Sequence, residues 1–336
     1  PYFFLYKFKI HFKILVEVIV MLRGLMRKSV FLGSAFVAMF FLCSGEVFSQ
    51  SLEQEATVEE NIPTEEGLTS TYVVTDMDGA AEALAKADSY KVDLQIQDRS
   101  FPNGGGSVPE VEVSSIHNGE TIFFYVTWSD ATKNDRAIKH EQFRDAVGFM
   151  FPIGIVEISP RTPFSPRMGD RGKPVNIWHW KADWERDLHA DGNYEHMEDV
   201  YPDMFTDFDF NPHPDYFNKK VHDSVPLMAG GIAAGSLLST PRGRSVEDLN
   251  AIGFGTLTSQ THQDVNGTGY WSDGKWHVMI YRPLISQDNN DVQFVAGQST
   301  FFNMAVWNGE EGDRNGLKSV SIRWRPITLE PIAYTK

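Results

Sequence analysis

The stretch DAVGFMFPIGIVEISPRTPFSPRMGDRGKPVNIWHW, residues 145–180, decides how we expect this chain to fold. It contains two short apolar runs, at 147–151 and 175–180, and each has the length of a buried strand. A loop rich in proline and arginine lies between them and ends in Arg167-Met168-Gly169-Asp170. A methionine that follows two prolines and precedes a glycine is poorly placed for an ordinary core residue. We therefore expect Met168 to hold its thioether over an apolar pocket.

The sequence around this stretch indicates an all-β protein. From residue 91 onward apolar and polar residues alternate, and Asn118-Gly119 joins two such runs in a pattern typical of a β-hairpin. A second hairpin is expected at 269–282, around Ser272-Asp273-Gly274. Two more strands are expected near the C-terminus, at 300–307 and 319–324. Many short strands and few helices predict an antiparallel β-sandwich with a few short helices.

Three further segments need an interpretation of their own. Gly104-Gly105-Gly106 lacks the Gly-Lys-Ser/Thr ending of a phosphate loop and does not lead into a helix, so we read it as a turn. Residues 183–225 form a long aromatic and acidic insertion, which we expect to be an ordered loop with helical turns. Ser245 with Asp248 resembles a capping box and predicts a brief helix. We expect one domain, residues 71–336, with no internal repeat.

The first 70 residues differ from the rest. We expect residues 1–20 to be untranslated upstream sequence and Met21, or Met26, to be the true start. Residues 21–49 have the basic, apolar and small-residue regions of a signal peptide, which predicts export to the periplasm or an equivalent extracytoplasmic compartment. A membrane anchor is the alternative, but the uninterrupted apolar run is shorter than the roughly 20 residues that a span needs. Residues 50–70 are predicted to be an acidic, flexible leader.

Composition excludes several classes of function. Cys43 is the only cysteine and lies in the predicted signal peptide, so the mature chain would have no disulfide, no thiolate iron–sulfur cluster and no haem bound through Cys-x-x-Cys-His. Residues 50–336 contain 24 basic and 43 acidic residues, a net charge of −19. Such a surface repels nucleic acid and anionic lipid and suits partners with basic patches. The common hydrolase and nucleotide-binding motifs are absent.

Several short segments, taken in order, carry a resemblance to a known family: Val126-Thr-Trp-Ser-Asp130, Asp145-Ala-Val with Phe151-Pro152, Met168-Gly169-Asp170 leading into Pro174-Val-Asn-Ile-Trp-His-Trp180, Gly253-Phe-Gly-Thr-Leu-Thr258, Trp271-Ser-Asp-Gly-Lys-Trp276 with Arg282-Pro-Leu284, and Ala305-Val-Trp-Asn-Gly309 with Lys318-Ser-Val-Ser321. Over about residues 90–330 the chain resembles the haem b-binding γ subunits of periplasmic type II DMSO-reductase-family molybdoenzymes. These include ethylbenzene dehydrogenase, chlorate and selenate reductase, dimethylsulfide dehydrogenase and nitrite oxidoreductase. The insertion with Tyr201-Pro-Asp-Met204 is most similar to the nitrite oxidoreductase γ (C) subunit.

The resemblance implies a β-sandwich with haem b at one end, whose iron is held by one methionine and one lysine. Met168 matches the family's Met-Gly-Asp position, and Met150 is the competing methionine. Lys275, at a hairpin tip, is the first choice of lysine, and Lys318 is the second. A lysine binds iron only as the neutral amine, so its pocket must lower its pKa by desolvation.

The residues around these ligands have expected roles as well. Trp271 and Trp276 flank Lys275 and would provide an apolar surface that excludes water from its amine. Arg282 would pair with a haem propionate, or else form a simple ion pair at the end of a strand. His179 and His277 are rival ligands, since the sequence does not decide which face of its strand each occupies.

The resemblance also implies a role. The chain would be a non-catalytic electron-transfer subunit that relays electrons between a molybdopterin catalytic subunit with its iron–sulfur subunit and a soluble cytochrome c. Nitrite oxidation to nitrate would be the reaction of the complex. The chain itself would have no integral membrane span after signal cleavage. The alternative is an exported sandwich module that binds carbohydrate or another small ligand without haem, with tryptophans as stacking platforms.

Overall fold

A computed structural model describes residues 67–154, 166–190 and 242–333, together with the isolated positions 200, 201, 231, 234 and 236. The predicted signal peptide, the residues before it, and most of both the acidic leader and the 183–225 insertion lie outside the described residues. The first strand begins at Leu68, inside the segment that we predicted to be leader. No helix in the described part of the chain has the length and apolar character needed to cross a bilayer.

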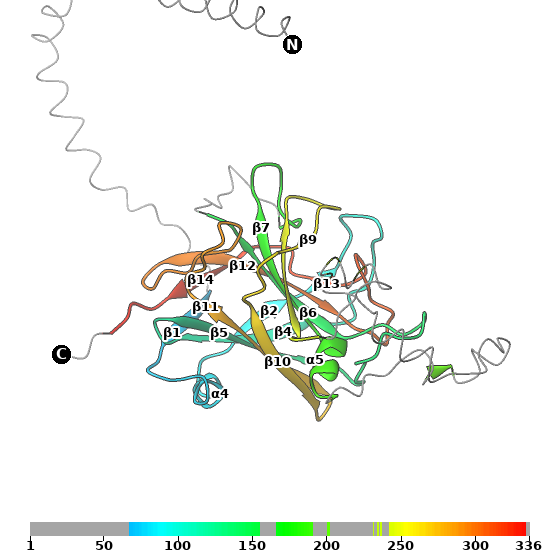
Figure 1. Cartoon of the computed structure of the whole chain (residues 1–336), viewed down its shortest axis with the longest axis horizontal. Coiled ribbons are helices and arrows are strands. Elements are labelled where there is room, and N and C mark those ends of the chain that lie inside the picture. Colours follow the sequence, from blue (N-terminus) through cyan, green and yellow to red (C-terminus); the bar gives the residue numbers. More distant parts are fainter. Residues whose placement is uncertain are drawn as a thin grey trace, which may run out of the picture. The chain divides into compact units, whose positions relative to one another are not determined.

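The described strands form two layers that face each other (Figure 1). The β5 sheet has the strand order β10 (Asn266–Ser272), β11 (Lys275–Pro283), β5 (Thr121–Ser129), β4 (Glu110–His117), β1 (Leu68–Tyr72) and β14 (Arg325–Leu329), with β2 (Tyr90–Asp93) beside β4. The β7 sheet has the order β12 (Ser299–Trp307), β6 (Ala146–Pro152), β7 (Val175–Lys181), β8 (Val246–Ala251) and β9 (Thr258–Ser259). The short strands β13 (Ser319–Val320) and β3 (Gln95–Ile96) extend the β7 sheet beyond β12.

Strand β12 joins the two layers because it changes partner along its length. Residues 299–302 pair with β14, and residues 303–307 pair with β6. The pairings are antiparallel except those of β1, which runs parallel to both β4 and β14. The prediction of an all-β sandwich is confirmed, and the helices are short: α4 (Ala80–Leu84) and α5 (Ala182–Leu188).

The two apolar runs at 147–151 and 175–180 form neighbouring central strands. All of β6 is buried, and β6 pairs with β7 along its whole length. Aromatic side chains from the two sheets meet between them: the ring of Phe124 lies 5.0 Å from that of Phe149, and the ring of Trp276 lies 5.1 Å from that of Trp180. Burial of such large apolar surfaces is the main force that holds the sheets together.

Both predicted hairpins form, and one predicted helix does not. Gly119, with φ 90°, lies in the turn between β4 and β5, while Asp273 and Gly274, with φ 51° and 75°, join β10 to β11. These positive angles are what a tight two-residue hairpin turn requires. The helix expected after Ser245 is wrong, because the segment forms strand β8 and pairs with β7. Tertiary pairing overrides the local capping pattern there.

Asp145 ties the beginning of β6 to the β5 sheet. Its Oδ2 accepts hydrogen bonds from the Asn134 backbone N–H at 2.7 Å and from Trp276 Nε1 at 2.9 Å, and its Oδ1 accepts one from the Gly309 N–H at 2.8 Å. In Asp145→Asn one acceptor oxygen becomes an NH₂ group that faces a donor. We expect the free energy of unfolding to fall by about 2 kcal/mol, measured by urea denaturation.

The exposed turn residue Asp273 offers a matched control for this substitution. Asparagine tolerates the positive φ that this position requires, so Asp273→Asn should change stability by less than about 0.5 kcal/mol. Equal urea midpoints for the two variants would show that the three hydrogen bonds of Asp145 add nothing to stability.

Candidate functional site

The candidate site lies on the outer face of the β7 sheet, the face turned away from the β5 sheet. Side chains alternate along a strand, so the two faces of β6 and β7 carry different residues. Phe149 and Trp178 point into the main core, whereas Met150 and Ile177 belong to a second, separate apolar cluster. That cluster also contains Val175, Ala251, Phe301 and Trp324.

Met168 packs against this outer cluster from the loop before β7. Its backbone has φ 61°, a left-handed conformation that costs a residue with a side chain roughly 1 kcal/mol. The Gly253 N–H donates a hydrogen bond to the Met168 carbonyl at 2.8 Å, which holds the loop against the end of β8. Gly169 must be glycine, because an added Cβ would lie 2.8 Å from the Ala251 carbonyl oxygen. The two candidate methionines, Met168 and Met150, therefore belong to the same apolar cluster.

Lys318 reaches the same face from the segment before β13. Its Nζ lies 4.7 Å from the centroid of the Trp307 ring, and Trp307 lies at the end of β12 next to β6. Lys318 is half-buried, and among the described residues no carboxylate pairs with its amine. Burial lowers the pKa of Lys318 to about 8. A desolvated lysine without a counter-ion is the state that a neutral amine ligand needs.

The glycine triplet holds the Lys318 backbone in place. The Lys318 N–H donates to the Gly104 carbonyl at 3.1 Å, and the Lys318 carbonyl accepts from the Gln97 N–H at 3.2 Å. Gly105, with φ 77°, passes so close that an added Cβ would lie 2.2 Å from the Lys318 backbone nitrogen. The triplet is an irregular segment with positive φ angles whose first glycine forms a β-bridge with Gln97, in place of the predicted turn, and this segment positions Lys318.

His179 completes the face between the methionines and the lysine. On β7 it follows Ile177 by two residues, and its ring lies 4.6 Å from the Trp307 ring. Within the described part of the chain its buried Nε2 has no hydrogen-bond partner. Burial, together with the nearby charges of Lys181, Arg144 and Lys318, lowers the pKa of His179 well below its usual value. Gly148 on β6 opposes His179 and lies under the Trp307 ring.

Lys275 lies on the far side of the sandwich from Met168. It is exposed at the start of β11 and alternates with Trp276, whose ring is buried between the sheets. Lys275 therefore points to the outer face of the β5 sheet. Because sheets in a sandwich pack about 10 Å apart, side chains on the two outer faces cannot reach one metal atom. The structure does not bring Met168 and Lys275 together, whereas Met168, Met150 and Lys318 share a face.

Trp271, Trp276 and His277 also lie away from the face that carries Met168. The Trp271 Nε1 donates to the Asp130 carbonyl at 3.0 Å, and Trp276 packs on Trp128 and Trp180 in the core, so neither covers Lys275. His277 lies on the outer face of the β5 sheet and bonds to the Tyr125 hydroxyl at 2.8 Å. His179 is thus the rival histidine that shares a face with Met168.

Arg282 is inside the sandwich and is not exposed at all. Its Nη1 lies 3.7 Å from Asp291 Oδ1, and its guanidinium carbon lies 5.0 Å from the centroid of the Trp178 ring. Because the Trp178 ring lies in the core, Arg282 is separated from the Met168 face by the β7 sheet itself. The ion-pair alternative for Arg282 fits this environment.

Sequence reasoning did not identify Trp307 as part of the site. The residue stands in the Ala305-Val-Trp-Asn-Gly309 motif, but nothing local shows that its ring lies between Lys318 and His179. A cluster of three aspartates, Asp248, Asp264 and Asp291, also escaped notice because its members are far apart in the sequence.

Comparison with known proteins bears on the family of this chain. A model of the ethylbenzene dehydrogenase family matches residues 81–319, most of the chain. A protein of Haloferax mediterranei, named as the haem subunit ORF7 of a respiratory nitrate reductase, is 24% identical over 75% of this chain and 67% of its own length. The chlorate reductase γ subunit of Ideonella dechloratans is 22% identical over 66% of this chain and 65% of its own length.

A third relative extends the match, and a solved structure shows a weak likeness. The dimethylsulfide dehydrogenase γ subunit of Rhodovulum sulfidophilum is 24% identical over 82% of this chain and 83% of its own length. A family 9 carbohydrate-binding module from Caldicellulosiruptor kristjanssonii, solved with glucose, covers 81% of this chain and 99% of its own at 7% identity with a TM-score of 0.35. A likeness of that degree says nothing about a ligand. On the family match, the chain belongs to the ethylbenzene dehydrogenase family, together with γ subunits of molybdoenzymes related to DMSO reductase.

Proposed function

We propose that this chain is an electron-transfer subunit that binds one haem b on the outer face of the β7 sheet. One observation carries the proposal: two thioethers, Met168 and Met150, and one desolvated lysine, Lys318, share a single face over an apolar floor. A methionine and a lysine are the two ligand types that the family resemblance implies. The name of the Haloferax relative, which describes a haem subunit, supports the same cofactor.

The side chains on the outer face of the β7 sheet fit a haem b. Met168 or Met150 would offer a soft, neutral sulfur, which favours Fe(II) and raises the reduction potential. Lys318 would offer its amine in the neutral form, which is consistent with its lowered pKa. The unpartnered His179 Nε2 is a buried polar atom of the kind that a bound polar group satisfies. When bound, the haem supplies a one-electron Fe(III)/Fe(II) couple.

The protein's own contribution is orientation and the exclusion of water. The Gly104–Lys318 hydrogen bond fixes the base of the lysine, and the Gly253–Met168 hydrogen bond fixes the methionine loop. Trp307 and the outer apolar cluster desolvate the space between them. A low local dielectric keeps the amine neutral and limits reorganisation when one electron arrives or leaves.

The finer assignment rests on the relatives and on charge. The electrons would pass between a molybdopterin catalytic subunit with its iron–sulfur subunit and a soluble cytochrome c, in an exported complex of the nitrite oxidoreductase type. Relatives named for nitrate reductase, chlorate reductase and dimethylsulfide dehydrogenase support a role beside a molybdoenzyme. A net charge of −19 on residues 50–336 would steer a basic cytochrome c.

Haem content tests the proposal directly. Chain expressed from Met21 with haem supply should purify with about one haem b per polypeptide, measured by the pyridine haemochrome spectrum, and should show the Soret band of six-coordinate iron. Protein that stays colourless after reconstitution and binds glucose or cello-oligosaccharide would contradict it. That outcome would favour the carbohydrate-binding alternative, which the family match does not favour.

A further inference from the structure

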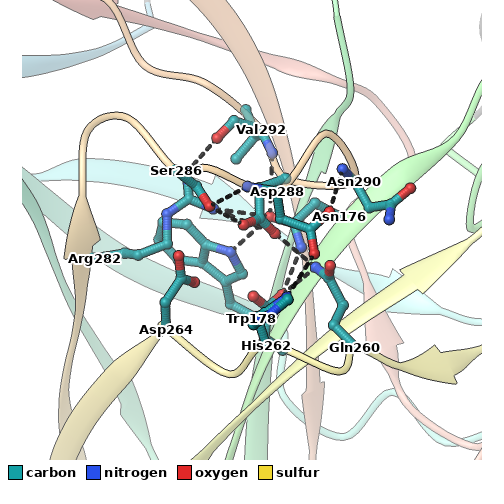
Figure 2. Close-up of polar contacts among 12 residues, drawn as sticks. Asn176, Trp178, Gln260, His262, Asp264, Arg282, Ser286, Asp288, Asn290 and Val292 are labelled. Carbon is teal, nitrogen blue, oxygen red and sulfur yellow. Dashed lines mark hydrogen bonds and ion pairs between the residues drawn. The ribbon is translucent and has the colours of Figure 1, made fainter.

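Three aspartates from separate segments converge beside β8. Asp248 lies on β8, Asp264 precedes β10, and Asp291 lies in the loop between β11 and β12. One carboxylate oxygen from each lies within 4.8 Å of the others. Figure 2 shows the polar contacts that surround these residues, including those of Asn176, Gln260 and Arg282.

Two fully or nearly buried side chains in this cluster leave a polar atom without a partner. Asp248 is 0% exposed, and its Oδ1 accepts from Asn176 Nδ2 at 2.6 Å and from Gln260 Nε2 at 2.9 Å. Within the described residues its Oδ2 has no hydrogen-bond partner. Gln260 is 7% exposed, and its buried Oε1 also has none. Buried acceptors are nearly always satisfied, so these atoms indicate a missing partner.

The charge in this region is also unbalanced. Arg282 is the cation that contacts the cluster, with its Nη1 3.7 Å from Asp291 Oδ1. In their ionised forms, three carboxylates against one guanidinium leave two negative charges in a site that is buried at Asp248 and Asp291 and half-buried at Asp264, which is costly without compensation.

We propose that Asp248, Asp264 and Asp291 bind one calcium ion. A divalent cation would balance the two excess charges and give the unpartnered oxygens a ligand. All candidate donors are oxygens, the ligands that calcium prefers, and Ca–O distances of about 2.3–2.6 Å allow two ligands of one ion to lie up to about 5 Å apart. The ion would tie β8 to the segment before β10 and to the loop after β11.

This site is separate from the proposed haem face. Asp248 pairs with Trp178, whose ring lies in the main core, whereas Met150 and Ile177 lie on the opposite face of the β7 sheet. Calcium binding therefore does not rest on the proposed function, and its test needs no haem.

Calorimetric titration of the EDTA-treated chain with CaCl₂ or MgCl₂ tests the proposal. We expect calcium to bind with a dissociation constant of about 10⁻⁵–10⁻³ M, more tightly than magnesium, and to raise the melting temperature by several degrees at saturation. Asp248→Asn and Asp264→Asn should each weaken calcium binding at least about tenfold. Both variants should fold without calcium, because they relieve the repulsion.

Asp288→Asn is the matched control, since this half-buried aspartate lies in the same loop as Asp291 but outside the group of three. It should keep wild-type calcium binding. Absence of calcium binding by the folded wild type up to 10 mM, stronger binding of magnesium, or an Asp248→Asn variant with wild-type affinity would each overturn the proposal.

Discussion

Haem-loaded protein that carries Lys318→Ala is expected to lose the spectrum of six-coordinate iron and to bind haem at least about tenfold more weakly. The substitution removes a desolvated amine that shares a face with Met168 and Met150 and that, unlike the Lys181 amine beside Glu247, has no carboxylate partner among the described residues. Lys275→Ala is the matched control, because this lysine is exposed on the outer face of the opposite sheet. Absorption spectra and haem-transfer measurements on both variants show whether Lys318 or Lys275 is the lysine ligand.

The pH dependence of the same spectrum gives a test that involves no substitution. Burial lowers the pKa of Lys318 to about 8, and the amine must lose its proton before it binds iron. The apparent affinity of the amine for iron should therefore be independent of pH well above pH 8 and should fall about tenfold for each pH unit well below it. Lys275→Ala should keep this profile. A spectrum that survives in Lys318→Ala and disappears in Lys275→Ala would exclude the outer face of the β7 sheet as the haem site.

The two methionines can be separated in the same experiment. If Met168 is the ligand, Met168→Ala should abolish six-coordinate iron, while Met150→Ala should only loosen the apolar cluster to which both belong. The left-handed backbone at Met168 and the close packing of Gly169 favour Met168, because strain of this kind persists where function needs it. The reverse pattern would assign the thioether to Met150.

The second large effect is expected for Gly105→Ala, which should lower the free energy of unfolding by about 3 kcal/mol or more. The new Cβ would lie 2.2 Å from the Lys318 backbone nitrogen and 2.7 Å from the Leu317 carbonyl carbon, so backbone must move. That movement breaks the Lys318–Gly104 hydrogen bond, and haem affinity should fall with stability. Urea denaturation measures the first change and haem titration the second.

Gly172→Ala is the control for backbone strain alone. Gly172 has φ 76°, nearly the same as the 77° of Gly105, but no atom lies within 4 Å of its added Cβ. This variant should lose only about 1 kcal/mol, the cost of a left-handed alanine. Equal losses in the two variants would show that the close approach to Lys318 is unimportant.

Local patterns in the sequence were enough to predict the secondary structure around the site. The apolar runs at 147–151 and 175–180 became β6 and β7, and Asn118-Gly119 and Asp273-Gly274 became hairpin turns. These features depend on neighbours in the chain: burial needs a run of apolar residues, and a tight turn needs positive φ. The Ser245–Asp248 pattern failed because pairing with β7 outweighs a capping preference.

The sequence by itself determined the all-β fold, the family and the candidate ligand types, methionine and lysine. Only the tertiary structure decided which members of each type share a face: it brought Lys318 to the side of Met168 and left Lys275 on the other. The physical reason is that a period of two divides each strand into two faces but does not tell which face turns inward. That depends on how β12 leaves one sheet and enters the other, and on contacts such as Gly105 with Lys318 that join segments over 200 residues apart.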